Sequence, residues 1–98
     1  MPYMYILECC DGSFYTGSTW DIEQRLWEHQ QGLGANYTKN HLPVKLLYYE
    51  EYDRIDDAFN REKQVQGWTR KKKLALIEER MEDLPVLAKK VFRKKRDK

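Results

Sequence analysis

The chain has 98 residues, 41% of them hydrophobic and 35% charged, with five Gly and three Pro. This length allows one domain with a modest core, and the composition excludes collagen-like, low-complexity and wholly disordered chains. No apolar run approaches the roughly 18 residues of a membrane span, and no basic segment leads into an apolar one at the start, so we expect a cytoplasmic protein without membrane contact.

Two β-prone segments open the chain. Residues 3–10 and 13–17 are rich in apolar and aromatic side chains, and Asp11-Gly12 lies between them. An Asp-Gly pair in this setting predicts a tight hairpin, because Gly adopts the positive φ of the turn without strain. After Gly17 we expect a helix that Asp21 caps and that Gly32 or Gly34 ends.

A loop, a third strand and two more helices follow. Residues 32–43 have no apolar period and predict a loop, whereas residues 44–52 are dense in Val, Leu and Tyr and predict a strand. A second helix is expected between Asp53 and Gly67, and a third begins after Thr69. The positions expected to be buried in these two helices are Ile55, Ala58, Phe59, Val65, Leu74, Ile77 and Met81.

These elements predict a single α+β domain over residues 1–83. Its order is ββ-α-β-α-α, with a small three-stranded antiparallel sheet, made of a hairpin plus a third strand, packed by three helices. Residues 84–98 form a basic tail that is either a short helix or disordered. The net charge of the whole chain is +2, but residues 86–98 carry +6, so residues 1–85 carry −4.

Glu62 has an unusual position for a charged residue. It lies three residues after Phe59 and three before Val65, on the apolar line of its helix, where a carboxylate has to be paired, protonated or bound to a metal. Taken alone, an ion pair with Arg25 or Lys45, or a place at the rim of the core, explains Glu62 as well as a metal does.

Two further pairs of residues are ambiguous when each is considered separately. Arg25 and His29 are four residues apart, so they share one side of the first helix, where such residues usually face solvent. Tyr5 and Tyr15 lie on adjacent predicted strands, where tyrosines usually belong to the core with their hydroxyls at its edge. Their joint arrangement with Glu62 is more informative than any one of them.

Together these residues resemble the GIY-YIG nuclease domain, over residues 3 to about 80. The resemblance is carried by Tyr3-Met4-Tyr5, Tyr15-Thr16-Gly17, Arg25, His29 and Glu62. Residues 34–38, 43–45, 61–64 and 67–68 further resemble the small stand-alone GIY-YIG proteins of bacteria. The family resemblance implies the family's fold and an endonuclease that hydrolyses phosphodiester bonds in DNA, with single-stranded and structure-specific substrates both open.

The resemblance also implies roles by position. Tyr5 and Tyr15 are the tyrosines of the two half-motifs, Arg25 is the family's arginine, His29 falls where members keep His or Tyr, and Glu62 is the metal-binding carboxylate. The chain departs from the family pattern at Tyr3, Met4 and Thr16. These residues occupy strand positions, so we expect the replacements to do little damage. It also has Ser18 where some members have Lys, and Leu74 where an Asn would follow Glu62, and these two losses bear on catalytic rate more than on fold.

The residue types suit hydrolysis that depends on Mg²⁺ or Mn²⁺. Mg²⁺ keeps most of its waters, so Glu62 and a substrate phosphate are enough to hold it, and Arg25 can pair two phosphate oxygens. The base is either Tyr15, which at a pKa near ~10 needs about 4 kcal/mol to ionise at neutral pH, or His29, with a pKa near ~6.5. Tyr5 partners Tyr15, and His29 otherwise supports the phenols.

The expected partner is nucleic acid, DNA by the resemblance, and no obligate protein partner is identifiable. Candidate phosphate contacts are Lys39, Lys45, Lys63, Arg70 and Lys71. A catalytically weak or inactive nucleic-acid-binding module is the alternative, which the missing polar groups and the basic tail favour. A protein-interaction domain with a structural Arg25–Glu62 ion pair is a third interpretation.

Overall fold

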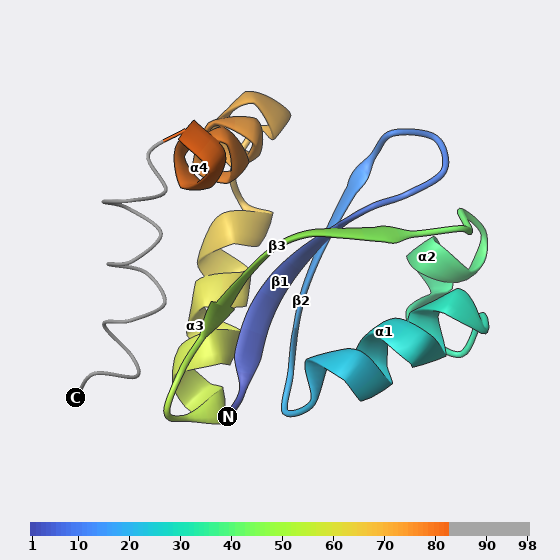
Figure 1. The fold of residues 1–98 in the computed structure, drawn as a ribbon, viewed down its shortest axis with the longest axis horizontal. Coiled ribbons are helices and arrows are strands. Elements are labelled where there is room, and N and C mark those ends of the chain that lie inside the picture. The colour runs from blue at the N-terminus through green and yellow to red at the C-terminus, as the bar shows by residue number, and fades with distance from the viewer. Residues whose placement is uncertain (83–98) are drawn as a thin grey trace.

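The computed structural model describes the backbone of residues 1–82 and the side chains of residues 1–78. Its elements are β1 (Tyr3–Glu8), β2 (Phe14–Thr19), α1 (Ile22–Gln30), α2 (Asn36–Lys39), β3 (Lys45–Glu51), α3 (Ile55–Gln66) and α4 (Arg70–Glu82) (Figure 1). The α+β class and the predicted element order are confirmed, with the short α2 as an addition. The predicted tail at residues 84–98 lies outside the described residues, as does the side chain of Met81.

The sheet is antiparallel throughout, with β1 in the centre and the strand order β2-β1-β3. The predicted hairpin forms at Asp11-Gly12, where Gly12 has a φ of +86° and its amide donates to a carbonyl of the turn at 2.8 Å. In the β1–β2 register, Tyr5 pairs with Gly17 and its neighbour two residues on pairs with Tyr15. β2 lies at the edge of the sheet and carries the second half of the predicted motif, Tyr15-Thr16-Gly17.

Helices cover both faces of the sheet, with α1 on one side and α3 and α4 on the other (Figure 1). One core cluster lies on the α1 side, and its buried members are Tyr5, Leu7, Cys9 and Val44. The other lies on the α3 and α4 side, and its buried members are Met4, Ile6, Tyr48, Val65 and Ile77. Because side chains alternate along a strand, β1 supplies residues to both clusters, and the sheet separates two apolar cores.

Most predicted helix ends are confirmed. Asp21 caps α1 by accepting a hydrogen bond from a backbone N–H of the first turn at 3.0 Å. Gly32, with a φ of +79°, follows the end of α1, and its amide donates to the His29 carbonyl at 3.0 Å. Thr69 caps α4, where its hydroxyl accepts from the Lys72 amide at 3.2 Å.

Four details differ from the prediction. α3 begins after Arg54 rather than Asp53, and Arg54 makes no side-chain cap; two Asp in the first turn instead favour the helix N-terminus electrostatically. Phe59 is 47% exposed, because its neighbour Ala58 faces the sheet and Phe59 lies about 100° further round the helix. Leu74 is 38% exposed, and four residues of the predicted loop form α2.

A buried ion pair fixes α3 against β3. Glu50 is 3% exposed, and its carboxylate accepts from the Tyr48 hydroxyl at 2.6 Å and the Tyr52 hydroxyl at 2.5 Å. The Arg61 guanidinium donates to both of its oxygens, at 3.0 and 3.2 Å. Since Arg61 directly precedes Glu62, this pair also sets the position along β2 at which Glu62 lies.

Candidate active site

Tyr5 reaches toward the β2 edge because its cross-strand neighbour is a glycine. A Cβ on Gly17 would lie 2.5 Å from the Tyr5 hydroxyl oxygen and 2.6 Å from Cζ, so only Gly leaves room for the phenol. The Tyr5 side chain is 2% exposed. Burial raises the pKa of Tyr5 to about 12, although the neighbouring Arg25 opposes this, so the phenol is neutral at physiological pH.

A chain of hydrogen bonds runs from Tyr5 through His29 to α2. The Tyr5 hydroxyl is 2.9 Å from His29 Nε2, and His29 Nδ1 is 2.8 Å from Thr38 Oγ1. The Thr38 hydroxyl donates its one proton to the Ala35 carbonyl at 3.0 Å. His29 Nδ1 must therefore be the donor to Thr38, which leaves Nε2 to accept from Tyr5. Gly34 makes this possible, since a Cβ there would collide with the His29 ring.

His29 is buried and neutral. Its side chain is 0% exposed, and burial, followed by the positive charge of Arg25, lowers the pKa of His29 to about 4, with Glu28 opposing. Both ring nitrogens are engaged in hydrogen bonds. This environment suits a residue that orients Tyr5 better than a base that must accept a proton from water.

Tyr15 is the more accessible of the two phenols. Its ring centroid lies 6.5 Å from that of Tyr5 and 5.3 Å from that of His29. The Tyr15 side chain is partly buried, and no described residue is hydrogen-bonded to its hydroxyl. Burial and then the charge of Glu62 raise the pKa of Tyr15, whereas Arg25 lowers it. The Tyr15 hydroxyl is therefore protonated and open to an incoming group.

Arg25 is held beside Tyr5 by a neighbour on its own helix. Its Nη1 lies 2.9 Å from Glu28 Oε1, and the Arg25 side chain is 33% exposed. Within the described part of the chain, neither Arg25 nor Lys45 forms an ion pair with Glu62, so the two pairings considered from the sequence are wrong. The exposed part of the guanidinium remains able to bind an anion.

Glu62 comes from α3, on the other face of the sheet. The Ser18 hydroxyl donates to Glu62 Oε1 at 2.5 Å, and the Gln66 amide donates to Oε2 at 2.7 Å. The same Gln66 amide donates to the Thr16 carbonyl of β2 at 3.2 Å. Both carboxylate oxygens are thus oriented by neutral donors, and no cation among the described residues compensates the Glu62 charge.

The predicted residues approach the β2 edge from both faces of the sheet. The register of β2 places Ser18, the partner of Glu62, on the opposite face from Gly17 and Tyr15. Even so, the charge of Glu62 contributes to the raised pKa of both phenols, and Arg25 acts on both in the other direction. The carboxylate and the guanidinium therefore act electrostatically on the same pair of phenols around this edge.

The donor set at Glu62 is compatible with a hydrated Mg²⁺ or Mn²⁺. Among residues 1–78, whose side chains the structure describes, no group of three or more His, Cys, Asp or Glu is placed to bind a metal, which excludes a cage of protein ligands in that part of the chain. Each oxygen of Glu62 accepts one hydrogen bond and keeps a lone pair. One oriented carboxylate is the kind of ligand that Mg²⁺ uses when it keeps its waters.

Sequence reasoning missed three residues that hold the site. Ser18 attracts notice in the sequence only as a replacement for Lys, although it bonds Glu62. Gln66 lies four residues after Glu62, and this helical spacing could have indicated the contact. Thr38 lies in the predicted loop, and no local pattern connects it to His29.

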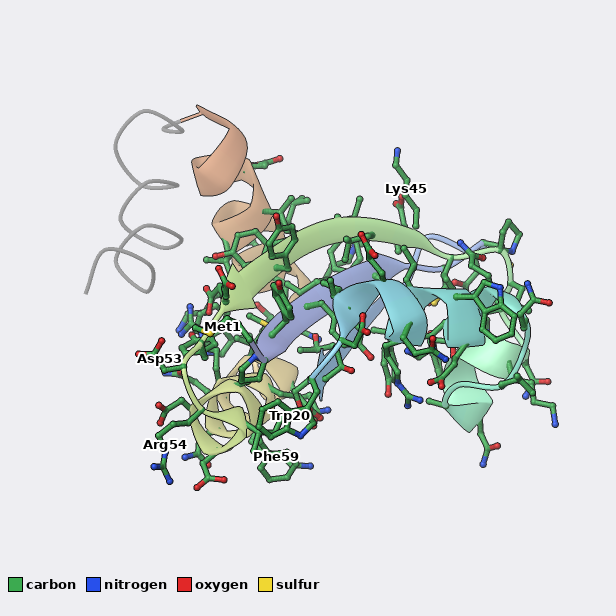
Figure 2. All side chains as sticks on the ribbon, turned by 60° about the horizontal axis from the view of Figure 1, so that its bottom comes forward. Met1, Trp20, Lys45, Asp53, Arg54 and Phe59 are labelled. Atoms are coloured by element: carbon green, nitrogen blue, oxygen red, sulfur yellow. The ribbon has the colours of Figure 1, made fainter. Side chains whose placement is uncertain are left out.

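The predicted phosphate contacts are dispersed over the surface, and all are exposed: Lys39, Lys45, Lys63, Arg70 and Lys71. Lys45 begins β3, at the sheet edge opposite to β2, and points away from the side on which Trp20 and Phe59 lie (Figure 2). The Lys63 ammonium lies 4.9 Å from the Phe59 ring centroid. Arg70 donates to a carbonyl of the hairpin turn at 2.7 Å, so it has a structural contact of its own.

Within residues 1–82, no helix has the length and apolar character needed to cross a membrane.

Comparisons with known proteins identify relatives of this chain. The GIY-YIG catalytic domain family matches residues 1–75. A UPF0213 protein of Streptococcus sanguinis is 51% identical over 81 residues, which cover 83% of this chain and 93% of that protein. A UPF0213 protein of Haloquadratum walsbyi is 47% identical over 77 residues, covering 79% and 86%.

A solved structure is also similar. The solution NMR structure of the UPF0213 protein BH0048 from Bacillus halodurans has a TM-score of 0.52 and 39% sequence identity, and the match covers 80% of this chain and 84% of that one. The resemblance seen in the sequence is thereby confirmed. The chain belongs to the GIY-YIG catalytic domain family, a nuclease superfamily.

Proposed function

We propose that this chain is an endonuclease that hydrolyses phosphodiester bonds in DNA and depends on Mg²⁺ or Mn²⁺. The observation that carries the proposal is the arrangement of two phenols, a guanidinium and an oriented carboxylate around one sheet edge in a GIY-YIG family member. Phosphodiester hydrolysis needs a cation site, a donor to the phosphoryl oxygens and a polar group beside the attacking water, and these side chains match that list.

Glu62 would hold the metal through the lone pairs that Ser18 and Gln66 leave free. When bound, the ion would stabilise charge on the phosphoryl oxygens and lower the pKa of water. Arg25 would pair the phosphate through its planar fork. We expect Arg25→Lys to keep the fold and to reduce cleavage about tenfold or more, because Lys keeps the charge and loses the fork.

Tyr15 would orient or deprotonate the attacking water. Its hydroxyl has no partner among the described residues, whereas the Tyr5 hydroxyl already donates to His29. The charge of Glu62 is one cause of the raised pKa of Tyr15, so neutralising that charge brings the phenol closer to ionisation. In this mechanism His29 is a positioning residue that fixes Tyr5 and, through ring contact, Tyr15.

The test is cleavage of single-stranded, branched and duplex DNA with and without Mg²⁺. We expect wild type to cut in the presence of the cation and Glu62→Gln to be inactive while its circular dichroism is unchanged. Glu78→Gln, at an exposed position of α4, is the matched control and should retain activity. Equal traces of cleavage by wild type and Glu62→Gln would identify a contaminant and refute the proposal.

Ser18→Ala probes the orientation of the carboxylate. Loss of a hydrogen bond to a metal ligand typically costs about 10- to 100-fold in metal affinity, so we expect a higher Mg²⁺ requirement with cleavage restored at high Mg²⁺. An unchanged Mg²⁺ dependence would show that Ser18 does not support the site. The alternative function, a module that binds without cutting, predicts salt-dependent DNA binding and no cleavage by any variant.

A further inference from the structure

A groove continues the candidate site along the β2 edge. Its volume is about 320 Å³, and it is lined by Phe14, Tyr15, Thr16, Tyr37, Gln66 and Lys73. This volume lies at the lower end of the range for ligand pockets. Two of its lining residues connect it to the site, since Tyr15 is one of the phenols and the Gln66 amide donates to Glu62. A ligand in this groove would therefore lie next to the reacting groups.

Lys73 is the cation in this lining, and it lacks a partner. Its side chain is partly buried, and no described residue forms an ion pair or a hydrogen bond with its ammonium group. Burial lowers the pKa of Lys73, and no neighbouring carboxylate opposes this effect. A partly desolvated ammonium without a counter-charge is less favourable than a paired one, so the groove favours an anion.

Lys73 ends a basic run over residues 70–73, and two other cations of this run, Arg70 and Lys72, are engaged elsewhere. The Arg70 guanidinium lies 4.1 Å from the Phe14 ring centroid and donates to the Gly12 carbonyl. The Lys72 ammonium lies 4.4 Å from the Trp68 ring centroid. Lys73 therefore differs from Arg70 and Lys72 in its contacts, and it is partly buried whereas Lys71 is exposed.

Thr16 adds a second polar group without a partner. It is 3% exposed, and among the described residues its hydroxyl is the one buried side-chain polar atom that makes no hydrogen bond. Its backbone carbonyl accepts from Gln66, so the residue is held at the wall of the groove. Because the Thr16 hydroxyl itself is buried, the Lys73 ammonium is the group that can balance the charge of an oxyanion in the groove.

Part of the groove lining is aromatic. The Tyr15 and Tyr37 rings are nearly parallel, at an interplanar angle of 15° with centroids 6.4 Å apart. The Tyr37 ring also stacks on His41 at 4.4 Å, which fixes its orientation. Aromatic rings of this kind bind bases without strong sequence preference. A lining that combines an ammonium group without a partner with aromatic rings matches the phosphate and the base of a nucleotide.

We propose that this groove is a subsite for the nucleotide next to the scissile bond, in which the Lys73 ammonium binds its phosphate. This inference rests on the proposed function, because it takes the strand of the substrate as the ligand. It identifies Lys73 as a substrate-binding residue, whereas Arg70 of the same run holds the hairpin.

The test compares Lys73→Met with Arg54→Met, both in the Glu62→Gln background so that no substrate is cut. Met keeps the alkyl stem of Lys73 and removes its charge. Arg54, labelled in Figure 2, is exposed. It precedes α3, whose 12 residues span about 18 Å, so it lies at the opposite end of that helix from Gln66. The measurement is fluorescence anisotropy of a labelled oligothymidylate over a range of salt concentrations, with inorganic phosphate as competitor.

We expect Lys73→Met to weaken binding about tenfold and to lower the salt slope by about one, while Arg54→Met changes neither appreciably. Equal effects of the two variants on binding would refute the subsite. So would displacement of the labelled oligonucleotide by inorganic phosphate at the concentration at which unlabelled oligonucleotide displaces it. Cleavage by wild type together with Lys73-independent binding would refute the subsite and leave the endonuclease. Lys73-dependent binding without cleavage by wild type would refute the endonuclease and leave a binding groove.

Discussion

Acid should destabilise the fold through His29. The pKa of this buried ring is lowered from 6.5 to about 4, so between these pH values the unfolded chain binds a proton that the folded chain does not. The stabilising effect of the neutral ring is complete above pH 6.5 and is lost as the pH falls toward 4. At about 1.4 kcal/mol per pH unit, the difference amounts to about 3 kcal/mol, a large part of the stability of a small domain.

Two measurements check this expectation. The chain has two histidines, so NMR can follow both imidazole Cε1–H signals, and His41→Asn identifies which is which. We expect the His29 signal to keep its neutral position down to about pH 5. In parallel, urea denaturation of wild type and His29→Gln between pH 7.5 and 4.5 should show their difference in unfolding free energy shrinking with acid, because carboxylates affect both proteins alike. A difference that stays constant, or a His29 titration near pH 6.5, would contradict the buried neutral ring.

Two further predictions concern the supports of the site. Gly17→Ala should lower the free energy of unfolding by about 1–3 kcal/mol, because its Cβ would overlap the Tyr5 phenol, whereas the nearest atom to a Cβ on Gly67 is 3.6 Å away and Gly67→Ala should be tolerated. Glu50→Gln should cost about 3 kcal/mol in urea denaturation, since it removes the anion that pairs with the largely buried Arg61. No loss of stability in Gly17→Ala would show that Tyr5 does not lie over β2, and an unchanged midpoint for Glu50→Gln would show that the ion pair does not hold α3.

The fold could be predicted wherever its signals were local. The Asp11-Gly12 turn, the Asp21 cap and the Thr69 cap each depend on residues within one turn, and all three form. Burial on α3 was harder to predict, because Ala58 and Phe59 are adjacent apolar residues and only the contact with β2 decides which one faces inward.

The candidate site could be predicted only in part. The resemblance supplied Tyr5 and Glu62, but it did not show that they belong to opposite faces of the sheet. The bonds from Ser18 and Thr38 join segments far apart in the chain, so no spacing rule indicates them. These contacts depend on how closely the helices approach the edge strand, which is a property of the packed molecule.

The division of the interior into two apolar clusters has a consequence for how the site can fail or adapt. The phenols and the imidazole are anchored on one side of the sheet, and the carboxylate is anchored on the other. A substitution that loosens the packing of Val65 would shift the Glu62 carboxylate relative to the phenols and the imidazole. The hydrogen bonds that join Tyr5, His29 and Thr38 would stay intact. Selection could therefore adjust the spacing between the two halves through buried positions, without replacing any group that meets the substrate.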